Sequence, residues 1–220
     1  MLKADFHLHT KEDKEDNIAH SAKELIKLAA KQKFSVLSFT FHNYLFYPKD
    51  LSQFAKKHNI TLIPGAELTI AGKHVLVHGI KTLPKITRLH DLEEIKDHTI
   101  ITAPHPFFPT VNALGNQLIE HINLFDNIEY TARYNHLINF NRKAVSIAKK
   151  YSKPLLGNSD CHHLNYFGYT FTNIAADNNL NSIIDSLKSG KFKLETKPIP
   201  LKPLLKSGFE SVYKEYILRK

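Results

Sequence analysis

The feature that most constrains this chain is the alternation of short apolar runs with amphipathic segments of helical period. The apolar runs predicted as strands are residues 3–6, 35–40, 61–63, 99–103, 127–130 and 155–158. The segments predicted as helices are residues 21–29, 48–58, 92–96, 116–121, 137–150 and 180–189. Such alternation predicts a mainly parallel sheet covered by helices.

Three further patterns complete the predicted organisation. Ser21 and Glu24 form the capping-box pattern that begins a helix. Residues 68–70 and 74–80 predict a β-hairpin, and residues 192–195 predict a final strand. The length of 220 residues suits one hydrophobic core. We therefore expect a single domain over residues 1–195, with a tail over residues 196–220 that packs on the same domain and includes a helix-like segment at 209–218.

The turn after the first predicted strand distinguishes two kinds of sheet. An open Rossmann-type sheet expects a glycine-rich turn at this point. Here the turn is His7-Leu8-His9-Thr10-Lys11, which contains no glycine. A barrel whose strand ends deliver functional side chains fits this turn better.

Composition narrows the partners and the compartment. The net charge of +9 favours anionic partners such as phosphate esters or nucleic acid. Many lysines occur at helical spacing, which indicates solvated helix faces more than a nucleic-acid surface. No apolar run reaches eighteen residues, so no membrane partner is expected. The N-terminus carries Asp5 and His7 where a signal peptide needs apolar residues, so we expect a cytoplasmic protein.

Histidines and carboxylates follow the predicted strands. The chain contains fourteen histidines, an excess for which metal binding is the commonest reason. His7 and His9 lie two residues apart at the end of the first strand, so both imidazoles face the same way. The later strand ends are followed by His42, Glu67, His78, His105, Asp160 and His162. In a parallel barrel these ends converge on one rim, which predicts a metal centre there. Histidine with carboxylate suits Mn, Fe or Zn.

These residues also carry a family resemblance over roughly the first three quarters of the chain. Residues 5–10 (DFHLHT), 40–43 (TFHN), 64–67 (PGAE), 103–106 (APHP) and 158–162 (NSDCH) occur in order. They resemble the successive motifs of the PHP (polymerase and histidinol phosphatase) phosphoesterase family. The resemblance implies a distorted (β/α)7 TIM-like barrel with two or three divalent metal ions. It implies as ligands His7, His9, His42, Glu67, His78, His105, Asp160 and His162, with Glu67 bridging two ions.

The chain departs from the family pattern at two places. The second motif is usually Thr-Asp-His, and Phe41 here replaces the acid that would orient His42. The loop after the first motif often supplies another ligand. Spacing does not choose among Asp13, Glu15, Asp16 and His20, so the third ion stays open.

Other residues near the predicted strand ends have two readings each. Arg133 is predicted to grip a phosphate oxygen, or it is a surface arginine, and Lys11 has the same two interpretations. Glu129 is either an outer partner of a metal ligand or a structural polar residue. His78 is either a ligand or an edge-strand histidine that faces water. Cys161, the single cysteine, excludes an internal disulfide and is predicted to be a small buried filler.

The predicted activity is metal-dependent hydrolysis of a phosphate ester. Bound cations would lower the pKa of water, and His162, His42 or a metal-bound water would protonate the leaving oxygen. The expected substrate is a small phosphomonoester of the nucleotide, sugar or histidinol phosphate type. The first alternative is a nuclease, which the net charge supports. The second is a non-catalytic metal-binding scaffold, which Phe41 and the acidic loop support. Oligomeric state is not readable from the sequence.

Overall fold

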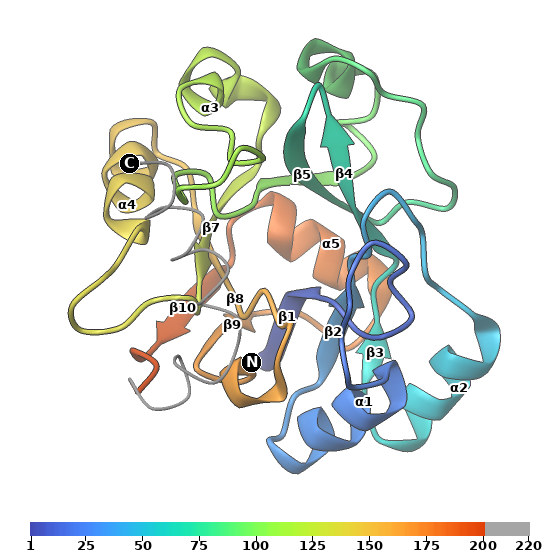
Figure 1. Ribbon diagram of the computed structural model, residues 1–220. Helices are drawn as coiled ribbons and strands as arrows, with labels where there is room; N and C mark the ends of the chain where they lie inside the picture. The colour runs from blue at the N-terminus through green and yellow to red at the C-terminus, as the bar shows by residue number, and fades with distance from the viewer. Residues whose placement is uncertain (201–220) are drawn as a thin grey trace.

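The strands of this protein assemble into two mixed sheets of five strands each, within the residues that the structure describes (Figure 1). The structure is a computed structural model, and it describes residues 1–200. The strands are β1 (Leu2–Leu8), β2 (Val36–Phe39), β3 (Thr61–Leu62), β4 (Gly65–Ile70), β5 (Lys73–His78), β6 (Ile100–Ala103), β7 (Asn127–Thr131), β8 (Leu155–Asn158), β9 (Thr170–Ile174) and β10 (Phe192–Thr196).

The first sheet has the order β10-β9-β1-β2-β3 and the second has the order β4-β5-β6-β7-β8. Strands β1, β2 and β3 run parallel, and so do β6, β7 and β8. Strands β9 and β10 run antiparallel at one edge of the first sheet, and β4 and β5 form the predicted hairpin at one edge of the second. Strand β5 is also antiparallel to β6. The expectation of a mainly parallel sheet is therefore met only in three adjacent strands of each sheet, which include one of its edges.

The predicted distorted (β/α)7 barrel is wrong, because the two sheets do not join into one ladder. Pro64, which has no N–H, separates β3 from β4, and only an isolated bridge from His42 to Glu67 joins the sheets on this side. On the other side, Gly157 of β8 meets Thr172 of β9 through the threonine hydroxyl, with two contacts of 2.9 Å. Side-chain contacts thus replace the regular strand pairing that a closed barrel needs.

Helices cover the outer faces of both sheets (Figure 1). The helices are α1 (Ala22–Lys31), α2 (Lys49–Lys57), α3 (Gln117–Glu120), α4 (Asn141–Lys150) and α5 (Leu180–Lys188), with 3-10 turns η1 (Leu89–Glu94), η2 (Ile122–Leu124) and η3 (Leu164–Tyr166). Helix α1 begins at the predicted capping box of Ser21 and Glu24. Helices α1 and α2 pack on the first sheet, and α4 packs on the second.

Helix α5 supplies the core that the two sheets share. Ile183 and Leu187 of α5 are fully buried against Phe6 of β1, Ile100 of β6 and Leu156 of β8. Apolar side chains from both sheets therefore meet in one cluster at this helix. This packing holds the sheets together where hydrogen bonds between strands do not.

Two predicted elements differ from the structure. The long helix predicted over residues 137–150 begins only at Asn141, because side-chain amides hold the preceding turns. Asn135 accepts hydrogen bonds from the backbone N–H groups of Leu137 and Ile138, and Asn139 accepts one from that of Asn141. Strand β9 is absent from the prediction.

The tail is described only in part. Up to residue 200 it packs on the domain, since the Ile199 side chain is buried and its N–H donates to the Tyr134 carbonyl. The helix-like segment predicted at 209–218 lies outside the described residues. Over residues 1–200, no helix combines the length and the apolar character that crossing a bilayer requires.

Candidate metal centre

The candidate metal centre lies at the edge of the molecule where the parallel strands end. His7 lies within β1 and His9 directly after it, while His105 follows β6. Asp160 and His162 follow β8 in the same way. The carboxyl ends of parallel strands meet at one edge, so these residues come together although they are far apart in the sequence.

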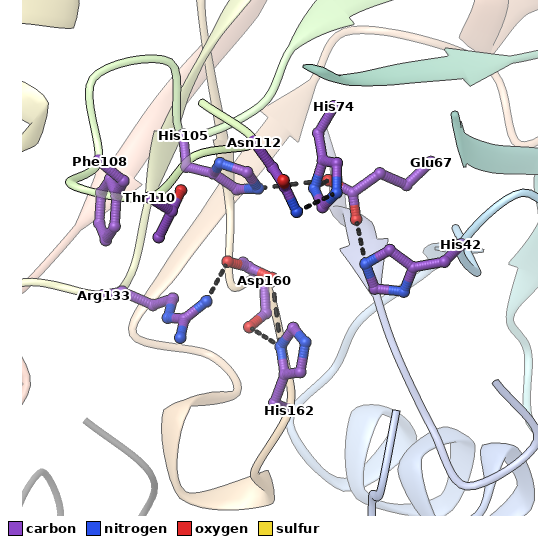
Figure 2. A pocket seen from close by; sticks show the side chains of 10 residues that line it. All are labelled: His42, Glu67, His74, His105, Phe108, Thr110, Asn112, Arg133, Asp160 and His162. Atoms are coloured by element: carbon purple, nitrogen blue, oxygen red, sulfur yellow. Dashed lines mark hydrogen bonds and ion pairs between the residues drawn. The ribbon is translucent and has the colours of Figure 1, made fainter. Parts of the chain in front are cut away.

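Glu67 of β4 occupies the middle of the centre (Figure 2). Its carboxylate is 1% exposed. The Oε2 atom lies 3.2 Å from His9 Nε2 and 3.3 Å from the Nε2 atoms of His7 and His42. Three imidazoles, two from the end of β1 and one from the segment after β2, therefore face one carboxylate oxygen.

The other oxygen of Glu67 faces two more imidazoles. Its Oε1 atom lies 2.9 Å from His74 Nδ1 and 3.2 Å from His105 Nε2. Each carboxylate oxygen thus has its own group of nitrogen neighbours. This is the arrangement that a carboxylate bridging two cations would have.

Asp160 and His162 form the side of the centre that faces β8. The Oδ1 atom of Asp160 lies 3.6 Å from His7 Nε2 and 3.3 Å from His162 Nδ1. Its Oδ2 atom accepts a hydrogen bond of 2.8 Å from Arg133 Nη1. Arg133 therefore occupies one oxygen of Asp160 and leaves the other turned toward the histidines (Figure 2).

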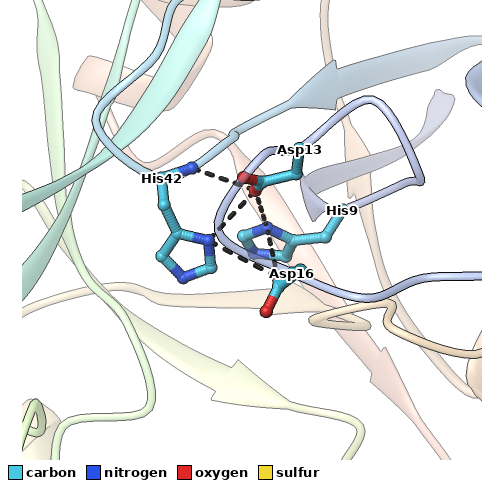
Figure 3. A group of neighbouring side chains, drawn as sticks. All are labelled: His9, Asp13, Asp16 and His42. Carbon is cyan, nitrogen blue, oxygen red and sulfur yellow. Dashed lines mark hydrogen bonds and ion pairs between the residues drawn. The ribbon is translucent and has the colours of Figure 1, made fainter.

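The loop after β1 contributes two carboxylates, Asp13 and Asp16 (Figure 3). Asp13 Oδ2 lies 3.0 Å from both His9 Nδ1 and His42 Nδ1. Asp16 Oδ2 lies 3.1 Å from His162 Nε2 and 3.4 Å from His42 Nδ1. These contacts identify which loop residues face the centre, a question that spacing left open.

The other two loop candidates point elsewhere. Glu15 accepts a hydrogen bond from the Asn43 side chain at the rim. His20 is buried but is a member of none of these clusters, and its carbonyl accepts a hydrogen bond from the Lys11 N–H. Asp13 also accepts from the backbone N–H of His42. It thereby orients this histidine, the role that the acid replaced by Phe41 would have had.

The donor set fits divalent cations. The ligand atoms of His9, Asp13, Asp16 and His42 all lie within 4.8 Å of one another, and three further groups of three residues meet the same limit. Donors about 2.1 Å from one ion lie within about 4.2 Å of each other, so the spacing needs little adjustment. Asp16 Oδ2 and His74 Nδ1 are buried and have no partner in hydrogen-bond geometry among residues 1–200. Lone pairs that converge in this way suit a cation.

A buried outer shell orients the ligand candidates. Glu129 of β7 is fully buried, and its Oε1 accepts a hydrogen bond of 2.8 Å from His7 Nδ1. The same oxygen accepts from Asn158 Nδ2, and Oε2 accepts from the backbone N–H of His105. Because Nδ1 of His7 carries this proton, its Nε2 presents a lone pair to the centre. Of the two interpretations of Glu129, the contacts favour the outer partner.

Electrostatics keep the central carboxylates ionised. Burial opposes the charged form of Asp160, but the Arg133 guanidinium and the His7 imidazole outweigh burial and hold the pKa of Asp160 well below its usual range. Burial acts in the same way on Glu67, yet His7 and its neighbours hold the pKa of Glu67 well below normal. A deprotonated carboxylate is the form that binds a cation.

The backbone is constrained at two ligand candidates. His105 has φ 28° and Asp160 has φ 50°, although neither is glycine. Left-handed backbone costs a non-glycine residue on the order of 1–3 kcal/mol and recurs at functional sites. The fold thus holds both side chains in directions that an extended strand end would not give them.

His78 does not join the centre, although the sequence predicted it as a ligand. Strand β5 runs antiparallel to its neighbours, so its first residues, not its last, lie at the edge where the centre forms. His74, near the start of β5, therefore stands where His78 was expected. His78 is fully buried on the far side, where its Nε2 contacts the Phe6 carbonyl at 2.8 Å. Burial lowers the pKa of His78 to about 4.

The remaining predicted residues lie as follows. Arg133 lines the cavity beside Asp160, whereas Lys11 is exposed and is not among the residues that line it. The Cys161 side chain is fully buried and its Sγ donates to the His163 carbonyl. These positions agree with a binding role for Arg133 and with Cys161 as a buried filler.

The centre opens into a small cavity of about 110 Å³ (Figure 2). Besides ligand candidates, the cavity is lined by Phe108, Thr110, Asn112 and Arg133. The first three belong to the loop between β6 and α3. Sequence reasoning did not single out this loop, because its residues carry no spacing signal.

Solved structures with the same fold come from several bacteria. PsfC from Pseudomonas syringae matches with a TM-score of 0.66 at 16% identity and 98% coverage of both chains. A protein from Bifidobacterium adolescentis described as a metal-dependent phosphoesterase matches with 0.57 at 12% identity, over 73% of this chain and 87% of that one. An amidohydrolase from Chromobacterium violaceum, solved with bound sulfate, matches with 0.56 at 14% identity, over 93% and 96%.

Sequence comparison finds similarity over parts of the chain. An uncharacterised protein of Methanocaldococcus jannaschii is 25% identical over 130 residues, which are 54% of this chain and 76% of that protein. The family model described as PHP-associated matches residues 139–192, from the turn before α4 into β10. This part of the chain is therefore similar to the PHP family. The resemblance seen in the sequence motifs is therefore confirmed, and the PHP motifs lie around Glu67 in the structure.

Proposed function

We propose that this protein is a metal-dependent hydrolase that cleaves phosphate esters, and that its substrates are small phosphomonoesters. The observation that carries the proposal is the joint position of the donor cluster and Arg133 on one cavity of about 110 Å³. Cations and a guanidinium on the same cavity suit an anionic substrate with exposed oxygens.

The residues that would hold the cations are those whose donor atoms converge. They are His7, His9, Asp13, Asp16, His42, Glu67, His74, His105, Asp160 and His162. Divalent cations, when bound, lower the pKa of water and offset the negative charge of a phosphate ester. Mn, Fe and Zn suit this mixture of imidazole and carboxylate.

Arg133 is the proposed phosphate-binding residue. One of its nitrogens, Nη1, is tied to Asp160, which fixes the direction of the guanidinium plane. The group has five N–H donors in a fixed fork, so donors remain for substrate oxygens. The Asp160 contact thus places a cationic side chain on the wall of the cavity.

A proton for the departing oxygen would come from His162 or His42. Both imidazoles line the cavity, where they are partly exposed to solvent. The one that a cation leaves free can hold the proton on a ring nitrogen and pass it to the leaving group. The sequence left these two candidates open, and the geometry keeps both.

The size of the cavity supports a terminal phosphate over an internal one. A phosphate at the end of a small molecule needs to place only its own oxygens between Arg133 and Glu67. A phosphodiester inside a polymer would in addition have to accommodate a nucleotide on each side of the phosphate at the same small cavity. The formal charge of +9, which favours the nuclease alternative, does not overcome this restriction.

The test is phosphate release from p-nitrophenyl phosphate and a panel of sugar and nucleotide monophosphates, with Mn²⁺ or Zn²⁺ supplied. We expect turnover that a chelator abolishes, and its loss in His9→Ala and Asp160→Ala while circular dichroism shows the fold unchanged. His90→Ala, at an exposed histidine of η1, is the matched control and should retain full activity. Retained turnover in both site variants would remove the proposal. Single-stranded oligonucleotides assayed alongside, at low salt, should not be degraded.

A further inference from the structure

Asn112 makes two hydrogen-bonding contacts with His74, one of the ligand candidates around Glu67. The Asn112 side-chain nitrogen Nδ2 lies 3.0 Å from His74 Nε2 (Figure 2). The Asn112 carbonyl also accepts a hydrogen bond of 2.9 Å from the His74 backbone N–H. Next to this pair, Lys73 Nζ donates to the Val111 carbonyl at 2.7 Å. The loop between β6 and α3 is therefore hydrogen-bonded to the start of β5 at Lys73 and His74.

The opposite edge of the His74 ring faces Glu67. His74 Nδ1 lies 2.9 Å from Glu67 Oε1, yet it has no partner in hydrogen-bond geometry within residues 1–200. His74 Nδ1 and Glu67 Oε1 are thus close to each other without being aligned for a hydrogen bond. Two neighbouring ligands of one cation have this kind of arrangement. To act as such a ligand, Nδ1 must be unprotonated, and the ring proton must then reside on Nε2.

The amide of Asn112 can accept a hydrogen bond from that Nε2–H through its oxygen. An asparagine amide has a donor end and an acceptor end of nearly equal shape, and a half turn exchanges them. With the nitrogen end toward Nε2, the ring proton lies on Nδ1. With the oxygen end toward Nε2, the proton is held on Nε2 and Nδ1 is free.

We propose that Asn112 is a positioning residue, which through its amide oxygen fixes the proton of His74 on Nε2 and so presents Nδ1, beside Glu67 Oε1, to a cation. The inference rests on the proposed function only in that the centre binds divalent cations. It gives the loop between β6 and α3 a role besides forming the cavity wall. Outer partners of this kind change metal affinity about 10–100-fold when they are removed.

The experiment measures Mn²⁺ and Zn²⁺ binding by equilibrium dialysis, which needs no catalytic activity. Asn112→Ala should weaken at least one bound equivalent by about 10-fold or more. Asn112→Asp keeps the acceptor and removes the donor, so it should retain affinity within about threefold of the native protein. Val111→Ala, a change at the exposed neighbouring side chain, is the matched control and should bind as the native protein does.

The outcomes separate the inference from a structural effect and from the proposed function. Circular dichroism and thermal unfolding identify a variant that fails to fold, and Asn112→Asp then carries the test alone. Native-like affinity in a folded Asn112→Ala would overturn the inference. Equal weakening in Asn112→Ala and Asn112→Asp would also overturn it, because the acceptor would then not be the group that matters. A protein that binds cations but releases no phosphate would refute only the proposed function.

Discussion

At the scale of single residues, Glu129 is the buried group on which the orientation of the centre depends most. Its two oxygens accept from three donors: His7 Nδ1, Asn158 Nδ2 and the backbone N–H of His105. A carboxylate has acceptors on both oxygens and no donor, so it satisfies all three. An amide of the same shape cannot.

We predict that Glu129→Gln weakens cation binding about 10–100-fold and destabilises the protein by about 1–3 kcal/mol. The added NH₂ group must face another N–H donor at a site with no solvent. Equilibrium dialysis with Mn²⁺ and urea denaturation measure the two effects. Glu120→Gln, at an exposed glutamate of α3, is the control and should change neither. Unchanged cation affinity in Glu129→Gln would show that His7 is oriented by other contacts.

Cys161 lies between two ligand candidates, but its environment makes it unreactive. The side chain is fully buried, and burial together with the charges of Asp5 and Asp160 raises the pKa of the thiol well above its ordinary value. The thiolate is the reactive form, so at pH 8 the folded protein should resist alkylation. We predict little modification by iodoacetamide before unfolding and one complete modification in guanidinium chloride, measured by intact mass. Rapid modification of the folded protein would contradict this prediction.

At the scale of elements, strand direction explains the main error in the predicted site. The sequence pattern identified the hairpin of β4 and β5, and the ligand prediction then took His78 from the end of its second strand. The second strand of a hairpin runs backward, so its start lies beside the ends of the parallel strands. His74 therefore follows from the hairpin prediction itself, once direction is applied.

Most other elements follow from local physical chemistry. The capping box at Ser21, Pro48 at the start of α2 and the turn of the β4–β5 hairpin each depend on a few neighbouring residues, and each was predictable. The start of α4 was not, because the amides of Asn135 and Asn139 compete with the helix. Strand β9 pairs with β1 across about 170 positions of sequence, a partnership that no local pattern encodes.

In strand β8, Gly157 is a position at which substitution should strongly destabilise the protein. A Cβ there would lie 2.6 Å from the Phe171 carbonyl oxygen and 2.4 Å from Leu194 Cδ1. The close approach allows the Thr172 hydroxyl to join the two sheets. We predict that Gly157→Ala costs about 3 kcal/mol, since a backbone carbonyl must move. Gly72→Ala, in open space with φ 75°, should cost about 1 kcal/mol. Equal urea midpoints for the two variants would contradict this account.

At the scale of the whole molecule, the sheets determine which parts of the site were predictable. The residues at parallel strand ends, from His7 to His162, were identified because alternation and motif order place them on one edge. The prediction of a closed barrel was wrong, because the two junctions between the sheets depend on Pro64 and Thr172 rather than on the number of strands. Asn112 gave no sequence signal, since an amide that positions a histidine looks like any polar loop residue.

The cluster around Glu67 buries several ionisable side chains inside the molecule. His7, His9, Glu67 and Asp160 are nearly or fully inaccessible to solvent, a costly arrangement unless something else offsets it. Their mutual contacts offset part of this cost, and bound cations would offset more. The central claim is therefore that the cluster around Glu67 is a cation site.

The most direct test is the metal content per chain, measured by elemental mass spectrometry on protein purified without a chelator or a metal-binding tag. We predict two to three equivalents of Mn, Fe or Zn per native chain. The double variant His9→Ala/Asp160→Ala should contain less than half of the native amount. Less than half an equivalent in the native protein, persisting after incubation with Mn²⁺ or Zn²⁺, would contradict the claim. The cluster would then be a structural network, and the protein a scaffold.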